Sequence, residues 1–171
     1  MIKSSEYKPV KTNRMKMEKM PLYEDIRNMI EKINRKPDEF IRIRNNCVFR
    51  TLRGTGLRES ELAGLDVRDV YLDEQYINSR HPRPYILVIS KGNYDYTDDG
   101  KDIVYLTKDA IAALTEWIKY RNTLDFIVDT EALFLNKNGK RMNEDNIKAM
   151  FRIYSGGKLT PHMMRHEYTT I

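Results

Sequence analysis

Two closely spaced glycines, Gly54 and Gly56, constrain most strongly how this chain can fold. Glycine tolerates positive φ angles, which stop a helix and redirect the chain. Apolar residues recur at helical spacing through residues 40–52, and leucines continue beyond the glycines. The sequence therefore predicts a long helix that ends near Gly54, followed by a turn that launches a short helix holding Arg58 and Glu61.

Apolar residues at helical spacing predict further helices elsewhere in the chain. One opens at Pro21-Leu22, carries apolar residues as far as Ile33 and is broken at Pro37-Asp38, where the chain restarts. One follows Thr107 and one follows Asn143, and the side chains of these two residues can cap helix N-termini. Thr160 before Pro161 predicts the start of a last helix. The residues expected to face inward are Leu22, Ile26, Met29, Ile30 and Ile33, then Ile111, Leu114, Trp117 and Ile118, then Ile147, Met150, Phe151 and Tyr154.

In the middle of the chain the pattern changes from helix to strand. Residues 85–89 are rich in β-branched and aromatic side chains, and residues 103–106 are expected to pair with them as an antiparallel strand. We expect a third strand around Tyr76-Ile77 and a short buried segment at residues 133–135. The predicted fold class is α+β, mainly α-helical, with a small three-stranded antiparallel sheet.

Length and composition restrict the classes of protein to which the chain can belong. Its 171 residues suffice for about one domain, and 30 Lys+Arg against 25 Asp+Glu give a net charge of +5. This mild basic excess suits a polyanion partner such as duplex DNA, although ordinary enzymes share it. Cys47 is the single cysteine, which excludes a disulfide framework within one chain. We find neither a long apolar run nor a secretory signal, and expect a cytoplasmic protein.

The first 20 residues are basic and carry few large apolar side chains. One interpretation is a disordered tail or linker; the other is a basic strap that lies along a DNA backbone. We therefore expect residues 21–171 to form the folded domain. The candidate DNA-binding residues of the tail are Lys11, Arg14, Lys16 and Lys19.

Three polar residues of the last predicted helix, His162, Arg165 and His166, fall at i, i+3 and i+4, which puts them on one helical face. Their position near a helix N-terminus favours an anion. The simpler interpretation is a solvated basic surface. A zinc site from the two histidines is weak, because a third ligand is missing nearby and Arg165 would repel a metal.

Lys91 follows the first β-rich segment at the predicted hairpin tip. An exposed lysine at such a tip commonly serves solubility. Its alternative role is that of a mobile cation which can be brought to a phosphate.

These features together resemble the catalytic domain of the tyrosine recombinases, the phage-type integrases. The family's Gly-Leu-Arg-x-x-Glu-Leu segment matches residues 56–62, its hairpin lysine matches Lys91, and its His-x-x-Arg-His segment matches residues 162–166. The resemblance covers roughly residues 20 to 171, and the three motifs occur in the family's order.

The resemblance implies attack of a tyrosine hydroxyl on a DNA phosphate, giving a 3′-phosphotyrosyl link without metal or nucleotide cofactor. Arg58 and Arg165 would then clamp the non-bridging oxygens, Lys91 would protonate the leaving 5′-oxygen, and His162 would assist. Glu61 is expected to support the basic residues, and His166 to be structural. The family also implies a tetramer on two DNA duplexes for a full-length protein.

The chain departs from the family pattern at its end, because the nucleophilic tyrosine is expected several helical turns after Arg165. Tyr168 lies too close to Arg165 to attack in line and is expected to pack against the domain. We therefore expect a chain truncated before its nucleophile and unable to cleave DNA unaided. The alternatives are a non-catalytic DNA-binding regulator and a metal-dependent nuclease, the latter disfavoured by the shortage of clustered acidic residues beside His162.

Overall fold

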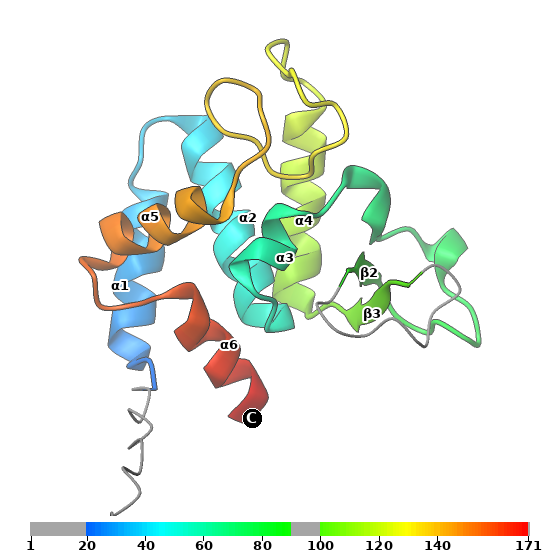
Figure 1. Ribbon diagram of the computed structural model, residues 1–171, viewed down its shortest axis with the longest axis horizontal. Helices are drawn as coiled ribbons and strands as arrows, with labels where there is room; N and C mark the ends of the chain where they lie inside the picture. The colour runs from blue at the N-terminus through cyan, green and yellow to red at the C-terminus, as the bar shows by residue number, and fades with distance from the viewer. Residues whose placement is uncertain (1–19, 90–99, 171) are drawn as a thin grey trace, which may run out of the picture.

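The computed structural model describes residues 20–89 and 100–170, which form a helical body with a small sheet at one side (Figure 1). The elements in chain order are α1 (Tyr23–Asn34), α2 (Glu39–Thr55), α3 (Glu59–Ala63), the 3-10 turn η1 (Val67–Asp69), β1 (Val70–Tyr71), the 3-10 turn η2 (Glu74–Tyr76), β2 (Tyr85–Val88), β3 (Asp102–Tyr105), α4 (Lys108–Arg121), α5 (Glu144–Ser155) and α6 (Pro161–Thr170). The predicted fold class is confirmed. Within the described ranges we find no helix long and apolar enough to cross a membrane.

Helix α2 occupies the centre of the helical body, with α1 and α5 on one side of it and α4 on the other (Figure 1). It begins at Glu39, because the Asp38 carboxylate accepts a hydrogen bond from the backbone N–H of Ile41 at 3.0 Å and caps the first turn. Its buried residues include Cys47, Val48, Phe49 and Leu52, each at most 1% exposed. Burial of this apolar surface supplies much of the driving force that holds the neighbouring helices in place.

Helix α2 ends near Gly54 as predicted, but only one of the two glycines takes a positive φ angle. The helix continues through Gly54 to Thr55, and Gly56 alone takes the left-handed conformation, with φ of 65°. Gly54 is instead needed for space, because a Cβ there would lie 2.5 Å from the Oγ1 of Thr107. Gly54 therefore leaves room for the start of α4 to pack against α2, and Gly56 ends the helix and turns the chain.

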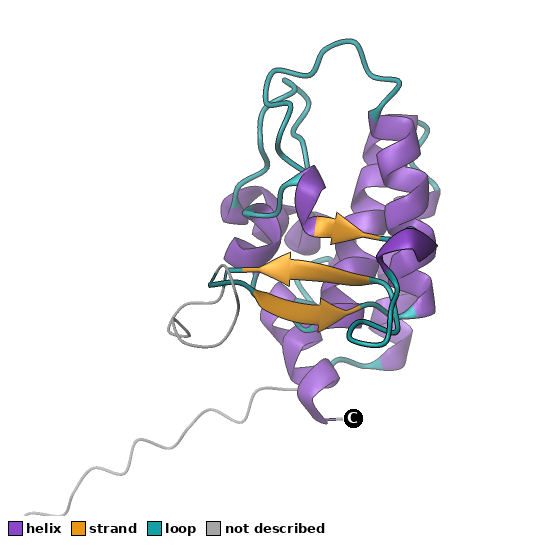
Figure 2. Ribbon diagram, turned by 90° about the vertical axis from the view of Figure 1, so that its right-hand side faces the viewer, coloured by secondary structure: helices purple, strands orange, loops and turns teal. Residues whose placement is uncertain are grey.

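The sheet has the order β1-β2-β3 and is antiparallel throughout (Figure 2). The pairing of β2 with β3 is confirmed, and Ile86 and Val88 of β2 are buried. The predicted position of the third strand was wrong: β1 lies at Val70–Tyr71, and the chain around Tyr76 forms η2. Tyr76 cannot join the ladder there because its backbone N–H donates locally, at 3.1 Å, to the carbonyl of Asp73.

The remaining helices follow the predicted caps. The Thr107 hydroxyl accepts from the N–H of Ala110 at 3.3 Å, and the Asn143 amide oxygen accepts from the N–H of Asn146 at 2.8 Å. Leu22 departs from the prediction, being 66% exposed, because it precedes the first turn of α1 and lies outside its buried stripe. The segment Leu133, Phe134 and Leu135 is fully buried, as expected.

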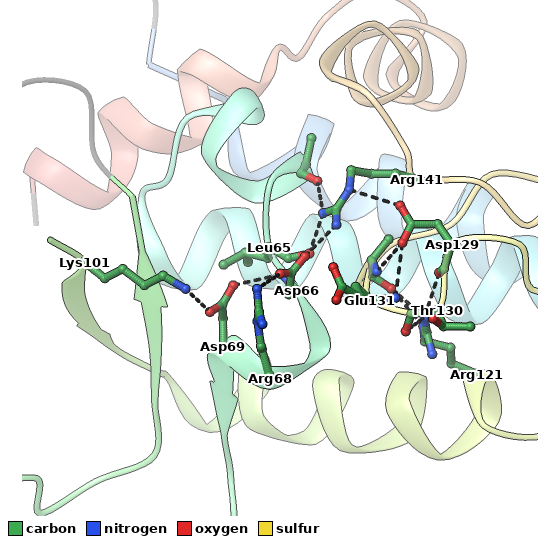
Figure 3. Close-up of polar contacts among 12 residues, drawn as sticks. Leu65, Asp66, Arg68, Asp69, Lys101, Arg121, Asp129, Thr130, Glu131 and Arg141 are labelled. Atoms are coloured by element: carbon green, nitrogen blue, oxygen red, sulfur yellow. Dashed lines mark hydrogen bonds and ion pairs between the residues drawn. The ribbon is translucent and has the colours of Figure 1, made fainter. Parts of the chain in front are cut away.

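A polar network holds the end of α3 against the loop that joins α4 to α5 (Figure 3). The Arg141 guanidinium donates to the carbonyl of Ala63 at 3.1 Å, to that of Leu65 at 2.9 Å, and to the Asp66 carboxylate. A second guanidinium, that of Arg68, lies 3.2 Å from the other oxygen of Asp66. These contacts fix α3, whose opposite end carries the predicted site.

Candidate functional site

Arg58 lies at the start of α3 as its N-cap residue, in an extended conformation with φ of −72° and ψ of 151°. The prediction that Arg58 sits within the short helix was therefore one residue off. Its backbone N–H donates to Glu61 Oε2 at 2.8 Å, and its Nη1 donates to Glu61 Oε1 at 3.0 Å. The Arg58 side chain is 49% exposed, so the rest of the guanidinium can reach a ligand.

Arg165 reaches the same place from α6, which begins where predicted. The Thr160 hydroxyl accepts from the N–H of Met163 at 3.2 Å. Arg165 Nη1 donates to the carbonyl of Gly56 at 2.7 Å and lies 3.9 Å from Glu61 Oε2. Its side chain is 31% exposed.

Arg58, Arg165 and Glu61 therefore form one cluster, although more than one hundred residues separate the two arginines in the chain. The Glu61 carboxylate is only 7% exposed and contacts both guanidinium groups. Two cations share one anion, which leaves one positive charge in excess at a partly open surface. Such a cluster can bind an oxyanion, because guanidinium groups match the geometry of phosphate oxygens.

Two contacts fasten α6 to the end of α2, one of them the expected packing of Tyr168 against the domain. Arg53 donates to both carboxylate oxygens of Glu167, at 3.2 and 3.1 Å. The Tyr168 ring packs against Gly56, where an added Cβ would lie 2.4 Å from the ring. Sequence reasoning missed the pair of Arg53 with Glu167, because nothing in the local sequence signals a contact between residues 114 positions apart.

The two histidines of α6 differ in exposure. His162 is exposed and helps to line a depression of about 940 Å³ between α5 and α6, together with Lys148 and Arg152. His166 is partly buried. Both stand on the same helix as Arg165, as the spacing predicts.

Some predicted residues lie outside the described part of the chain: Lys91, Lys11, Arg14, Lys16 and Lys19. Their proposed contacts with DNA stay predictions. Within residues 20–89 and 100–170 no group of three or more His, Cys, Asp or Glu side chains could hold a metal ion. Metal independence of the chemistry likewise stays a prediction.

The amino-acid sequence is similar to a known protein family and to several of its members. Residues 23–171 match the model of the phage integrase family. The tyrosine recombinase XerC of Neisseria gonorrhoeae is 32% identical over 131 residues, covering 74% of this chain and 37% of that protein. XerC of Vibrio cholerae serotype O1 is 26% identical over 160 residues, covering 91% of this chain and 46% of that protein. The chain thus spans less than half the length of these curated relatives.

Solved structures that resemble this chain also come from recombinases and integrases. The crystal structure of XerA recombinase superposes with a TM-score of 0.68 at 23% identity, covering 98% of this chain and 51% of that one, which supports the fold. The Tn1549 transposon integrase, solved in complex with circular intermediate DNA, gives a TM-score of 0.55 at 26% identity, covering 90% of this chain and 52% of that one. The chain belongs to the phage integrase family, the tyrosine recombinases.

Proposed function

We propose that this chain is the catalytic domain of a site-specific DNA recombinase, and that it holds one phosphate of duplex DNA between Arg58 and Arg165. The observation that carries the proposal is the convergence of both guanidinium groups on Glu61. The carboxylate fixes their directions while a positive charge remains in excess. An anion between them would be bound by side chains that are already oriented.

In the proposed reaction, charge spreads over the non-bridging oxygens of the phosphate as a tyrosine hydroxyl attacks. Arg58 and Arg165 stabilise that charge through hydrogen bonds to these oxygens. The 5′-oxygen leaves as an alkoxide unless it receives a proton, and we assign that proton to Lys91. His162 hydrogen-bonds the phosphate or handles the proton of the nucleophile. The phosphotyrosyl link conserves the bond energy, so rejoining consumes no nucleotide cofactor.

Related structures support duplex DNA as the partner. The Tn1549 transposon integrase was solved with circular intermediate DNA, and XerH recombinase was solved with its difH substrate. We further propose, from the family resemblance of the sequence motifs alone, that the whole protein assembles as a tetramer on two duplexes. The net charge of +5 agrees with a polyanionic partner.

Binding to duplex DNA can be measured by fluorescence anisotropy as a function of salt. The logarithm of the affinity should fall linearly with the logarithm of salt concentration, with a slope of about −0.9 for each phosphate contact. Arg58→Gln and Arg165→Gln should each weaken binding about tenfold or more and make the slope shallower. Arg35→Gln is the matched control, since that side chain is 79% exposed and distant in sequence from the cluster. A salt-independent affinity, or equal losses in all three variants, would contradict the proposal.

Strand cleavage needs a separate test. A chain extended beyond Ile171 by the tyrosine-bearing segment of a relative should become covalently trapped on nicked suicide DNA. Changing that tyrosine to Phe should abolish trapping while leaving DNA binding intact. If the extended chain binds DNA without ever forming an adduct, the non-catalytic regulator becomes the better description.

A further inference from the structure

A second polar site lies at the opposite end of α2 from Arg58 and Arg165. A depression of about 510 Å³ is lined by residues from the start of α2, the turn at 136–138 and α5. Arg44, in its lining, precedes the last residue of α2 by 11 positions, which at 1.5 Å per residue is about 16 Å. Figure 1 shows the start of α2 at the top of the molecule and α6 at the bottom.

Arg44 is a buried cation without an acidic partner. It is 8% exposed, and among the described residues no carboxylate lies within 4.0 Å of its guanidinium. Its hydrogen bonds go to neutral acceptors, namely Asn45 Oδ1 at 3.1 and 2.9 Å and the Leu135 carbonyl at 3.1 Å. Burial lowers the pKa of Arg44 to about 10, so the group is still charged at neutral pH. A buried charge of this kind is costly unless an anion compensates it.

Asn45 adds unused donors beside that charge. It is 1% exposed, and among the described residues its Nδ2 makes no well-formed hydrogen bond, although the Asn45 side chain interacts with the Tyr154 hydroxyl. The amide cannot be reversed to remove this, because Oδ1 is held by two donors of Arg44. Three of the five guanidinium N–H groups are used, which leaves two, and the amide adds two more. The Tyr154 hydroxyl can accept at most one of these four N–H groups, so at least three donors lack an acceptor among the residues that the structure describes.

The rim of the depression has the same sign of charge. Its charged lining residues are Lys36, Arg44 and Lys137 against Asp38, three positive and one negative, for a net of two positive charges. A dianion rich in oxygen acceptors matches this lining better than a neutral or singly charged group. The volume suits a small molecule, and Met150 and Ile153 offer apolar surface beside the charges.

We propose that this depression binds the phosphate group of a small molecule, at a site separate from the cluster of Arg58 and Arg165. The phosphate accepts from the free N–H groups of Arg44 and Asn45, and Lys36 and Lys137 approach it from the rim. The inference stands apart from the proposed function, since neither DNA cleavage nor DNA binding is needed for it.

The experiment is a titration of the ¹⁵N-labelled chain, followed by NMR at the Asn45 side-chain amide and at Arg44 Nε. Inorganic phosphate and phenyl phosphate are the probes, and sodium chloride at matched ionic strength is the reference. Both probes should give saturable shifts at these two positions that chloride does not reproduce. Tighter binding of phenyl phosphate would identify a phosphorylated organic molecule as the ligand, and equal binding would identify free phosphate.

Asn45→Asp is the decisive variant, because it supplies Arg44 with an internal anion of nearly the same shape. It should weaken phosphate binding about tenfold or more. Asn122→Asp adds the same charge at an exposed helix end and should bind as the unaltered chain does. Should Asn45→Asp fail to fold, Lys137→Glu at the exposed rim should still weaken binding several-fold. The proposal is overturned if phosphate produces no saturable shift at Arg44 and Asn45, or if a folded Asn45→Asp binds it unchanged.

Discussion

Glu61 accepts two hydrogen bonds from Arg58, one from its backbone N–H at 2.8 Å and one from its guanidinium at 3.0 Å. Its side chain is 7% exposed and also lies 3.9 Å from Arg165 Nη1. The same carboxylate thus stabilises the start of α3 and orients the two arginines. Charge-assisted contacts at a shielded position are stronger than those of exposed pairs.

Glu61→Gln should therefore lower the free energy of unfolding by about 1–2 kcal/mol, because an amide replaces the ion pairs at unchanged size. Glu59→Gln is the matched control on the same helix. Glu59 lies 3.6 Å from the half-exposed Lys148, so its loss should be below about 0.5 kcal/mol. Urea denaturation of the two variants measures the difference. Equal losses in free energy of unfolding would show that the contacts of Glu61 are no stronger than those of an exposed surface ion pair.

At the scale of secondary-structure elements, the helices were predictable and the first strand was not. The side chains of Asp38, Thr107 and Asn143 each accept a hydrogen bond from the backbone N–H three residues later and so cap the start of a helix. Such local contacts can be recognised in a single sequence. Strand β1 has only two residues, and its Tyr71 pairs with Tyr85 across an intervening turn. Such pairing depends on a partner distant in sequence, which single-sequence patterns do not specify.

The candidate site was predictable only through the family resemblance of its motifs. The residue types near Arg58 and Arg165 do not by themselves indicate that the two helices meet. The contacts that bring them together involve the carbonyl of Gly56 and the pair of Arg53 with Glu167, which is 114 residues away in sequence. Backbone carbonyls leave no mark in the sequence, and long-range pairs leave none that one sequence can reveal.

The junction of α2 and α6 can be tested with a pair of glycines. Gly56 has φ of 65° and Gly156 has φ of 64°, so alanine meets the same backbone strain at both, about 1 kcal/mol or more. Only at Gly56 would the new Cβ also meet a side chain, that of Tyr168 at 2.4 Å. Gly56→Ala should therefore cost about 1 kcal/mol more than Gly156→Ala in free energy of unfolding. Adding Tyr168→Ala to Gly56→Ala should remove the excess; persistence of the full loss would mean that α6 does not pack there.

At the scale of the whole molecule, charged side chains join the helical body to the loop before α5 and to the sheet (Figure 3). Asp66 pairs with Arg141 from that loop, while Asp69 pairs with Lys101 beside β3. The N–H of Asp66 donates to Asp69 at 2.9 Å, so the two pairs are linked. The segment after α3 therefore connects both parts of the fold, and weakening its contacts should lower the free energy of unfolding of the whole domain.

Asp66→Asn should make this connection measurable through pH. Burial opposes ionisation of Asp66, but hydrogen bonds and charge from Arg141 and Arg68 outweigh it, and its pKa is lowered from the ordinary 3.8. A carboxyl whose pKa is lower in the folded state stabilises the protein above the unfolded-state pKa, and this stabilisation is lost as pH falls through the folded-state pKa.

The unaltered chain should thus exceed Asp66→Asn by about 1–2 kcal/mol in free energy of unfolding at pH 7, with the gap closing at pH values below 3.8. Asp73→Asn, at an exposed turn without a side-chain cap, should change stability by less than about 0.5 kcal/mol at pH 7. Urea denaturation between pH 2 and pH 7 provides the curves. If Asp66→Asn runs parallel to the unaltered chain over this range, the Asp66 charge does not stabilise the fold, and the network in Figure 3 owes its effect to neutral hydrogen bonds.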